Sequence, residues 1–136
     1  MKIREYVSGD SRNIVEILRL NNQYDYPHVE GPEAMDRVAA CPAAIALVAD
    51  VDGRVVGYIR AVYDGARALI HLLSVHPDHQ GLGVGSALLR AVEAELRKRG
   101  APGTTVTVTE ESAAYWEKQG YRRLPAFLML KEFRTG

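Results

Sequence analysis

Residues 76–89 read HPDHQGLGVGSALL, and this stretch decides how the chain folds. An apolar run over residues 69–75 leads into it, and apolar residues at helical spacing follow over 84–99. Between the two runs lie three glycines spaced two apart, Gly81, Gly83 and Gly85. Glycines allow a tight turn and let the backbone come close to a ligand. The pattern predicts a strand, a glycine-rich turn and a helix start, where N–H groups and the helix dipole favour a phosphate or pyrophosphate.

Two familiar phosphate-binding glycine motifs do not match. A P-loop requires Gly-Lys followed by Ser or Thr, and here Gly85 is followed by Ser86 and Ala87. A dinucleotide-binding loop requires G-x-G-x-x-G near the first strand of a βαβ unit. Its third glycine would fall on Ser86, and the segment comes after most of the predicted strands. We therefore reject the P-loop and disfavour the dinucleotide loop.

A third pattern fits. The spacing Gln80-x-x-Gly83-x-Gly85 resembles the acetyl-CoA pyrophosphate loop of the GNAT superfamily of N-acetyltransferases, which has the pattern Q/R-x-x-G-x-G/A. Residues 72–78, LLSVHPD, resemble the family's preceding strand and its V-x-P-x-x link. Residues 114–121, AYWEKQGY, resemble its last helix, which usually ends Y-E-K-x-G-F. The order and spacing of these blocks make the resemblance much more specific than the loop alone.

The resemblance covers about residues 2–134 and is sharp over 54–121. It implies an α/β class fold of GNAT type, an acyl-CoA N-acyltransferase fold with a mixed (α+β) sheet that splays between its fourth and fifth strands. The pantetheine arm of CoA lies in that splay. Periodicity and turn signals give the matching order β-α-α-β-β-β-α-β-α-β-β. We expect strands at 2–7, 44–51, 54–63, 68–75, 104–109, 121–124 and 126–131, and helices at 11–21, 32–40, 84–99 and 112–119.

Bulk composition restricts the function classes. A chain of 136 residues predicts one domain, 1–136. Its 17 basic and 17 acidic residues cancel, so there is no overall positive field for nucleic acid or an anionic membrane. A lone cysteine, Cys41, agrees with a reducing compartment. The start of the chain shows no apolar leader and no run approaches a membrane span, so we expect a cytoplasmic protein.

Amine acetylation requires a base, because a free alkyl amine is protonated near neutral pH. His71 lies within an otherwise apolar strand, and many members of the family carry a Glu or His base on that strand. An imidazole with an ordinary pKa is largely neutral and able to accept a proton. Strand alternation puts His71 on the face of Leu69 and Leu73, unless a bulge intervenes. The other interpretation is a solvent-facing strand histidine without a catalytic role.

The resemblance also implies which groups contact the co-substrate. Backbone N–H groups before the loop would stabilise the developing oxyanion, and the matching residues are Leu73, Ser74 and Val75. The pyrophosphate contacts would come from Gln80 and from the following loop residues, Gly81, Leu82, Gly83, Val84, Gly85 and Ser86. The alternatives are ordinary strand pairing and a connecting turn without a ligand.

The last predicted helix departs from the family pattern. Four residues before Gly120, where the family usually has its tyrosine general acid, this chain has Trp116, which cannot donate a proton at physiological pH. Either the adjacent Tyr115 takes this role after a shift in register, or the CoA thiolate leaves without a protein acid. Tyr115 would point about 100° away from Trp116 on a helix. Trp116 itself would pack against the pantetheine arm or the core.

The acceptor side is less determined. Tyr24, Tyr26 and His28 lie with Asp25 and Glu30 in the loop that walls the acceptor pocket in this family, although an ordinary surface loop fits equally well. Aromatic and acidic groups would suit a cationic amine. The short link at 122–125 leaves little room for a protein clamp and favours a small molecule over a peptide.

The sequence thus predicts an acetyl-CoA-dependent N-acetyltransferase that acts on a primary amine by direct attack in a ternary complex, since Cys41 is no obvious acyl carrier. The alternatives are a non-catalytic acyl-CoA sensor, a protein N-terminal or lysine acetyltransferase, and an unrelated nucleotide-phosphate binder. We expect no metal, because His76-x-x-His79 lacks a third ligand. We expect no nucleic-acid or membrane partner, and the sequence is compatible with a homodimer.

Overall fold

The computed structural model describes residues 1–134, which form five strands and five α-helices. The strands are β1 (Lys2–Glu5), β2 (Ala44–Val51), β3 (Arg54–Tyr63), β4 (Ala68–Val75) and β5 (Thr105–Val106). The helices are α1 (Ser11–Leu20), α2 (Pro27–Glu30), α3 (Pro32–Ala40), α4 (Val84–Lys98) and α5 (Ala113–Lys118). Short 3-10 turns precede α1 and α4, at Ser8–Asp10 and Pro77–His79.

The strands form one mixed sheet in the order β1-β2-β3-β4-β5. The first three pairings are antiparallel and the β4–β5 pairing is parallel. Two hairpins follow from Asp-Gly turns, as predicted. At the first, Asp52 and Gly53 both adopt positive φ, at 53° and 86°, the turn geometry that Asp-Gly favours. The predicted α/β class with a mixed sheet is confirmed.

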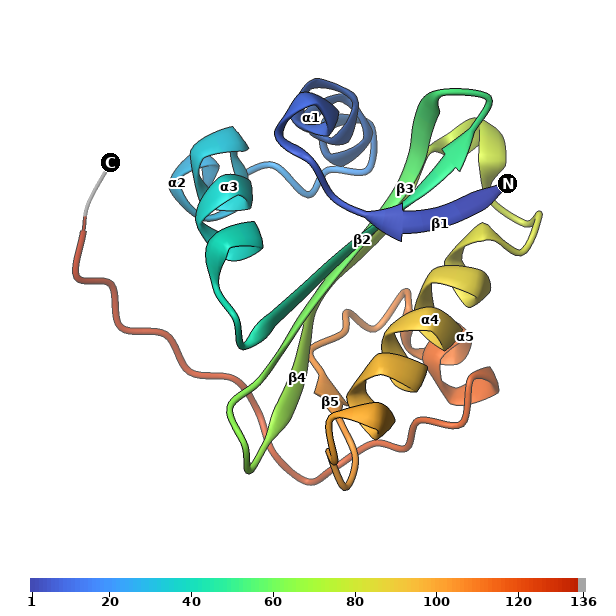
Figure 1. Cartoon of the computed structure of the whole chain (residues 1–136). Coiled ribbons are helices and arrows are strands. Elements are labelled where there is room, and N and C mark those ends of the chain that lie inside the picture. Colours follow the sequence, from blue (N-terminus) through green and yellow to red (C-terminus); the bar gives the residue numbers. More distant parts are fainter. Residues whose placement is uncertain (135–136) are drawn as a thin grey trace. The chain divides into compact units, whose positions relative to one another are not determined.

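Helices cover both faces of this sheet: α1 and α3 lie on one face and α4 on the other (Figure 1). On α1, Ile14, Ile17 and Leu18 are fully buried, because i, i+3 and i+4 share a helix face. They join a core of Tyr6, Met35, Val48, Val55 and Tyr58. We name the two surfaces the α1 face and the α4 face.

Helix α4 packs unusually close to β3. A Cβ atom at Gly57 would lie 2.9 Å from Leu88 Cδ1 and 3.0 Å from Val84 Cγ1. Real Cβ atoms do not approach so closely, so glycine lets the first turns of α4 lie directly on the strand. Val84 and Leu88 continue into a buried helix stripe with Val92 and Leu96. The start of α4 is therefore fixed by packing.

The chain divides into two compact units, Met1–Val106 and a second that begins at Thr107. In the second unit, α5 is the only helix among the described residues. Two expectations were wrong. Strand 104–109 shrinks to Thr105–Val106, and no described residue of 121–131 lies in a strand. Pro125 has no N–H group to donate to a ladder, and Ala126 donates to Leu124 two residues back, which interrupts an extended run.

Candidate functional site

The glycine turn lies between β4 and α4. Gly81 and Gly83 have φ of 77° and 84°, in the left-handed region that strains other residues. A Cβ atom at either position would meet nothing within 4 Å, so the backbone is open on that side. The sequence motif therefore forms a turn whose main chain a ligand can reach.

The start of α4 presents backbone donors. Gly83 is the N-cap residue and provides no side-chain cap. The first helical bond runs from the Ala87 N–H to the Gly83 carbonyl at 3.0 Å. The N–H groups of Val84, Gly85 and Ser86 precede that bond and lie at the positive end of the helix dipole. These three donors fit a phosphate or pyrophosphate.

Side-chain amides hold the turn against the end of β4. Gln80 Nε2 donates to the Val75 carbonyl at 3.0 Å and to Asn21 Oδ1 at 3.3 Å. Asn21 Nδ2 donates to the same carbonyl and to Ser74 Oγ, both at 2.8 Å. The buried Ser74 hydroxyl in turn donates to Gln23 Oε1. Gln80, predicted as a co-substrate contact, anchors the loop in this structure.

The β3–β4 ladder decides which backbone groups of β4 face outward. The His76 N–H donates to the Val56 carbonyl at 2.8 Å, which fixes the phase of the ladder. Because antiparallel pairs alternate, the Ser74 main chain faces β3 while the groups of Leu73 and Val75 face the other edge. The Val75 carbonyl accepts its side-chain donors on that other edge, which agrees with this phase.

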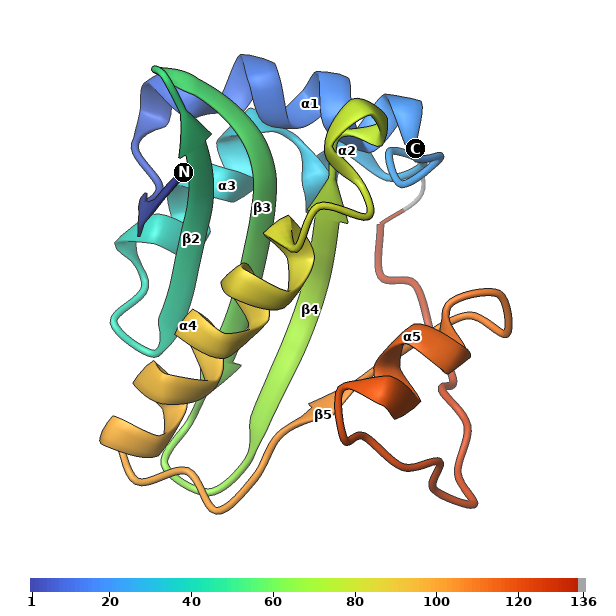
Figure 2. The ribbon, with the colours of Figure 1, turned by 90° about the vertical axis from the view of Figure 1, so that its right-hand side faces the viewer.

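Toward the end of β4, this other edge has no β5 partner. β5 pairs with β4 only at Leu69 and Ile70 (Figure 2). The N–H groups of Leu73 and Val75 therefore lie past the end of this pairing. Such groups can serve as oxyanion donors, since they are not committed to the β5 ladder. Within the predicted trio, Ser74 is directed away by its phase.

The β3–β4 ladder contains a bulge at His71, the residue predicted as the base. Arg60 pairs with Leu72 and Ala61 pairs with Ile70, so His71 is the extra residue. Alternation from Ile70 puts His71 on the α1 face, which it shares with Leu72 and Arg60. Partial burial lowers the pKa of His71 below its ordinary value, and the positive charge of Arg60 lowers it further. The lowered pKa favours the neutral imidazole, and the residue is exposed to solvent.

The sequence reasoning missed Arg60. Its side chain is buried on β3, with 4% of the residue exposed. Nη2 donates to the Val29 carbonyl at 2.9 Å and lies 3.3 Å from Glu30 Oε2. Nε and Nη1 are buried and have no hydrogen-bond partner among the described residues, and neither has the Tyr58 hydroxyl. The sequence signal that could have revealed Arg60 is a single charged residue within the otherwise apolar run 55–63.

The predicted acceptor residues make two separate contacts in the structure. Tyr24 is partly buried and stacks under the Arg19 guanidinium, 5.1 Å from the ring centroid. Tyr26 is half exposed and meets the His28 ring edge-on at 6.2 Å. His28 lies on α2, a short helix that the sequence patterns did not predict. Glu30, one of the expected acidic groups, is occupied by Arg60.

Tyr115 and Trp116 belong to the second unit. Their rings pack edge to face at 5.6 Å, and Trp116 packs in the same way on Tyr121 at 5.2 Å. The Tyr115 hydroxyl is buried and has no hydrogen-bond partner among residues 1–134. Trp116 is buried, as its aromatic contacts require.

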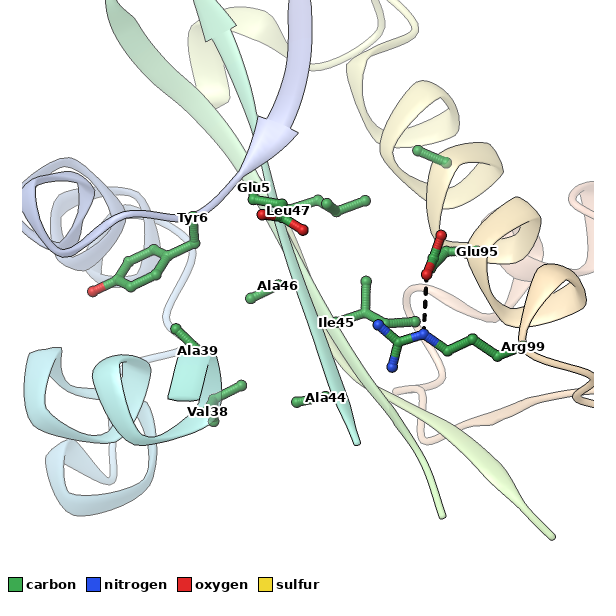
Figure 3. Close-up of a pocket in the computed structure, with 11 residues that line it drawn as sticks. Glu5, Tyr6, Val38, Ala39, Ala44, Ile45, Ala46, Leu47, Glu95 and Arg99 are labelled. Carbon is green, nitrogen blue, oxygen red and sulfur yellow. Dashed lines mark hydrogen bonds and ion pairs between the residues drawn. The ribbon is translucent and has the colours of Figure 1, made fainter. Parts of the chain in front are cut away.

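A cavity of about 210 Å³ lies elsewhere, at the outer edge of β2 (Figure 3). The β1–β2 ladder covers Leu47 to Asp50, and one further bond joins the Tyr6 N–H to the Ala46 carbonyl. Ala44–Ala46 border the cavity, with Val38 on one side and the Arg99–Glu95 ion pair on the other. No residue of β4 or the glycine turn lines it. Across residues 1–134 we find no group of three or more metal-ligating side chains, and no helix long and apolar enough to cross a membrane.

Known structures share this fold over nearly the whole chain. The PaiA N-acetyltransferase from Thermoplasma acidophilum, solved with coenzyme A, is 18% identical with a TM-score of 0.81, covering 93% of this chain and 92% of that one. The ribosomal-protein-alanine N-acetyltransferase from Brucella melitensis biovar Abortus is 20% identical (TM-score 0.72; 98% and 100% covered). An aminoglycoside 6'-acetyltransferase type Ii is 24% identical (TM-score 0.74; 90% and 83% covered).

A family model also matches the sequence. The model of the acetyltransferase (GNAT) family matches residues 13–121, which include the bulge, the glycine turn and α5. The chain therefore belongs to the GNAT acetyltransferase family. The resemblance that the loop suggested is confirmed.

Proposed function

We propose that this GNAT-family chain transfers an acetyl group from acetyl-CoA to the primary amine of a small molecule, by direct attack in a ternary complex. The observation that carries the proposal is the open glycine turn at an uncapped helix start, directly after the outward-facing end of β4. An anion-binding turn beside free strand amides provides for a phosphate-bearing acyl donor.

The turn and the strand edge divide the contacts with acetyl-CoA between them. The N–H groups over 81–86 would hold the pyrophosphate, with Gln80 keeping the turn in place. Leu73 and Val75 would offer N–H groups to the thioester carbonyl oxygen. When bound, acetyl-CoA supplies the activated acetyl thioester. No other cofactor and no metal is needed for this chemistry.

In the proposed step the acetyl group passes from sulfur to nitrogen, and one proton is transferred at each of these two atoms. The amine nitrogen attacks the thioester carbon, a C–N bond forms, and the C–S bond breaks with its electron pair going to sulfur. His71 takes the proton that the amine loses, which its lowered pKa permits. The thiolate then takes a proton from the Tyr115 hydroxyl or from water. Trp116 would pack on the pantetheine arm, and Tyr24, Tyr26 and His28 would line the acceptor side.

A second candidate is a non-catalytic acyl-CoA-binding module. The observation that favours it is Trp116, which stands where the resemblance expects the acid and has no acidic proton. Thiolates are fair leaving groups without a protein acid, so the transferase remains the first proposal.

The test follows thiol release from acetyl-CoA across a panel of small amines and peptides, together with calorimetry of CoA, ATP and NAD binding. The transferase predicts CoA binding and amine-dependent thiol release. CoA binding with no release across the panel supports the second candidate. Absence of CoA binding contradicts both.

A further inference from the structure

The α1 face of β3 carries a cationic group that the proposed chemistry leaves unused. Arg60 keeps its guanidinium buried, and an arginine cannot shed its charge in a protein. A buried charge is expensive to maintain unless it is paired and fully hydrogen-bonded. The partners of Arg60 therefore indicate what this position is built to bind.

These partners satisfy only part of the Arg60 guanidinium group. Only Nη2 is engaged, by the Val29 carbonyl and by one oxygen of Glu30 at 3.3 Å. A bidentate carboxylate would use two N–H groups, but Nε and Nη1 have no hydrogen-bond partner among residues 1–134. The Tyr58 hydroxyl, two residues back on the same strand face, lies against the Arg60 guanidinium and donates to no acceptor among the described residues. Within the same described part of the chain, Glu30 Oε2 is also buried without a hydrogen bond, so the ion pair leaves groups on both partners unsatisfied.

Glu30 is a poor permanent partner for this cluster. Burial raises the pKa of its carboxyl, and the charge of Arg60 only partly opposes the rise. Glu30 ends α2, a helix of four residues with no buried side chain. A carboxylate that is held by one contact on such a helix can leave without disturbing the core.

The cluster also adjoins the proposed base. Arg60 pairs with Leu72 across the β3–β4 ladder, next to the bulge at His71. Arg60 is close enough for its charge to lower the pKa of His71. A ligand that is held by Arg60 would therefore have its neighbouring atoms beside the imidazole.

We propose that Arg60 binds a carboxylate of the acceptor, which replaces Glu30, so that the acceptor is an amino-acid-like amine with a carboxylate close to its amino group. The inference rests on the proposed transferase function and names its substrate class. It refines the expectation of a simple cationic amine by adding a carboxylate that the buried Arg60 guanidinium can bind.

The experiment compares matched acceptors that differ only in the anion: an α-amino acid, its amide, and the amine without the carboxyl group. With acetyl-CoA saturating, thiol release should give a kcat/KM roughly tenfold to a hundredfold higher for the acid, as a charge-assisted bidentate contact provides. Arg60→Gln should remove the preference, while CoA binding by calorimetry stays unchanged.

The variant Glu30→Gln distinguishes a binding site at Arg60 from a structural latch, meaning an Arg60–Glu30 pair that only holds α2 in place. This test is informative even if the Arg60→Gln variant does not fold. Removing the internal competitor should lower KM for the acid at least about threefold and leave the amide unaffected. Glu33→Gln makes the same charge change on the exposed start of α3 and serves as the control. A latch would give no gain for the acid, and that result overturns the inference.

The failures can be told apart. Acetylation of all amines without an acid preference overturns the inference and leaves the transferase standing. If no amine is acetylated although CoA binds, the transferase fails. In that case, amide hydrogen exchange of residues 26–31 is measured with and without the free amino acid. A change in exchange that Arg60→Gln abolishes supports carboxylate binding at Arg60, and no change overturns it.

Discussion

The middle of β4 and the turn that follows the strand offer different kinds of chemical groups. At the last residues of β4 and in the following turn, the chain offers main-chain N–H groups, and side chains such as Gln80 and Ser74 only hold the frame. At the bulge, the groups available for chemistry are the side chains of His71 and of Arg60 on the neighbouring strand. A main-chain site needs glycines at set spacings, whereas a side-chain site needs residues brought together by the sheet.

This difference assigns separable tasks to the two regions. The turn should determine whether CoA binds, and the bulge should determine whether and on what the acetyl group is transferred. Substitutions in one region are therefore expected to leave the measured property of the other region intact. Each experiment below is chosen to test that separation.

The largest effect should come from His71→Ala. Without a base on the strand, kcat/KM should fall roughly 10²- to 10⁴-fold, the usual contribution of a positioned base. The calorimetric Kd for CoA should stay within about twofold, because the glycine turn lies beyond the end of β4 and His71 lies in the middle of the strand. A weakened CoA affinity would show that the two regions are coupled.

The double substitution Gly81→Ala with Gly83→Ala should break the turn. Each alanine costs about 1–2 kcal/mol at positive φ, and leaving that conformation removes the N–H array, so CoA affinity should fall roughly thirtyfold to a thousandfold. Gly53→Ala with Gly65→Ala is the matched control, because these hairpin glycines have similar φ and equally open surroundings. Equal losses of CoA affinity in both pairs would contradict a specific role for the turn.

The pH profile should report His71. Because burial and Arg60 lower its pKa, kcat/KM should rise with pH around a midpoint below the ordinary value of 6.5. Arg60→Gln should move this midpoint upward, and the titratable neighbours Glu30 and Tyr58 remain in both proteins. The unfolded chain binds more protons below pH 6.5, so stability from this group is full above that pH and is lost as pH falls through the folded pKa. A midpoint at or above 6.5 would exclude His71 as the titrating base.

Ser74→Ala should have the smallest effect on function. Asn21 and Gln23 each lose a buried partner, so the free energy of unfolding should fall by about 1–3 kcal/mol in a denaturant titration. CoA affinity should fall only a few-fold, because Gln80 still holds the turn. The exposed Ser8, whose hydroxyl donates to Asp36, gives the control Ser8→Ala, with a change within about 0.5 kcal/mol.

Much of the first unit could be predicted from local patterns. The strands 44–51, 54–63 and 68–75 have the predicted bounds, because Asp-Gly turns fix both hairpins. The glycine turn could be predicted for the same reason, since positive φ is written in the residue type. The strands expected at 121–131 failed because a strand needs a partner edge, which an apolar segment with Pro125 does not specify.

Arg60 marks the limit of the sequence reasoning on the site. Its meaning depends on Glu30 and His71, which lie 30 and 11 residues away in the chain and meet it only through the α1 face. For Gln80 the motif predicts a ligand contact, and the structure adds a role in the loop, since its side-chain amide donates to the Val75 carbonyl. The motif therefore predicts the main-chain geometry directly, whereas the side-chain contacts become visible only in the fold.

The exposed, unbonded thiol of Cys41 has a practical consequence. It is the chain's sole cysteine, and it follows directly on α3. Reagents that count free CoA by its thiol will also count one equivalent per protein molecule, so turnover must be read above that stoichiometric background or with Cys41→Ser. The same thiol is a natural single attachment point for a fluorophore, from which movement of α2 and α3 during acceptor binding could be recorded without adding any residue.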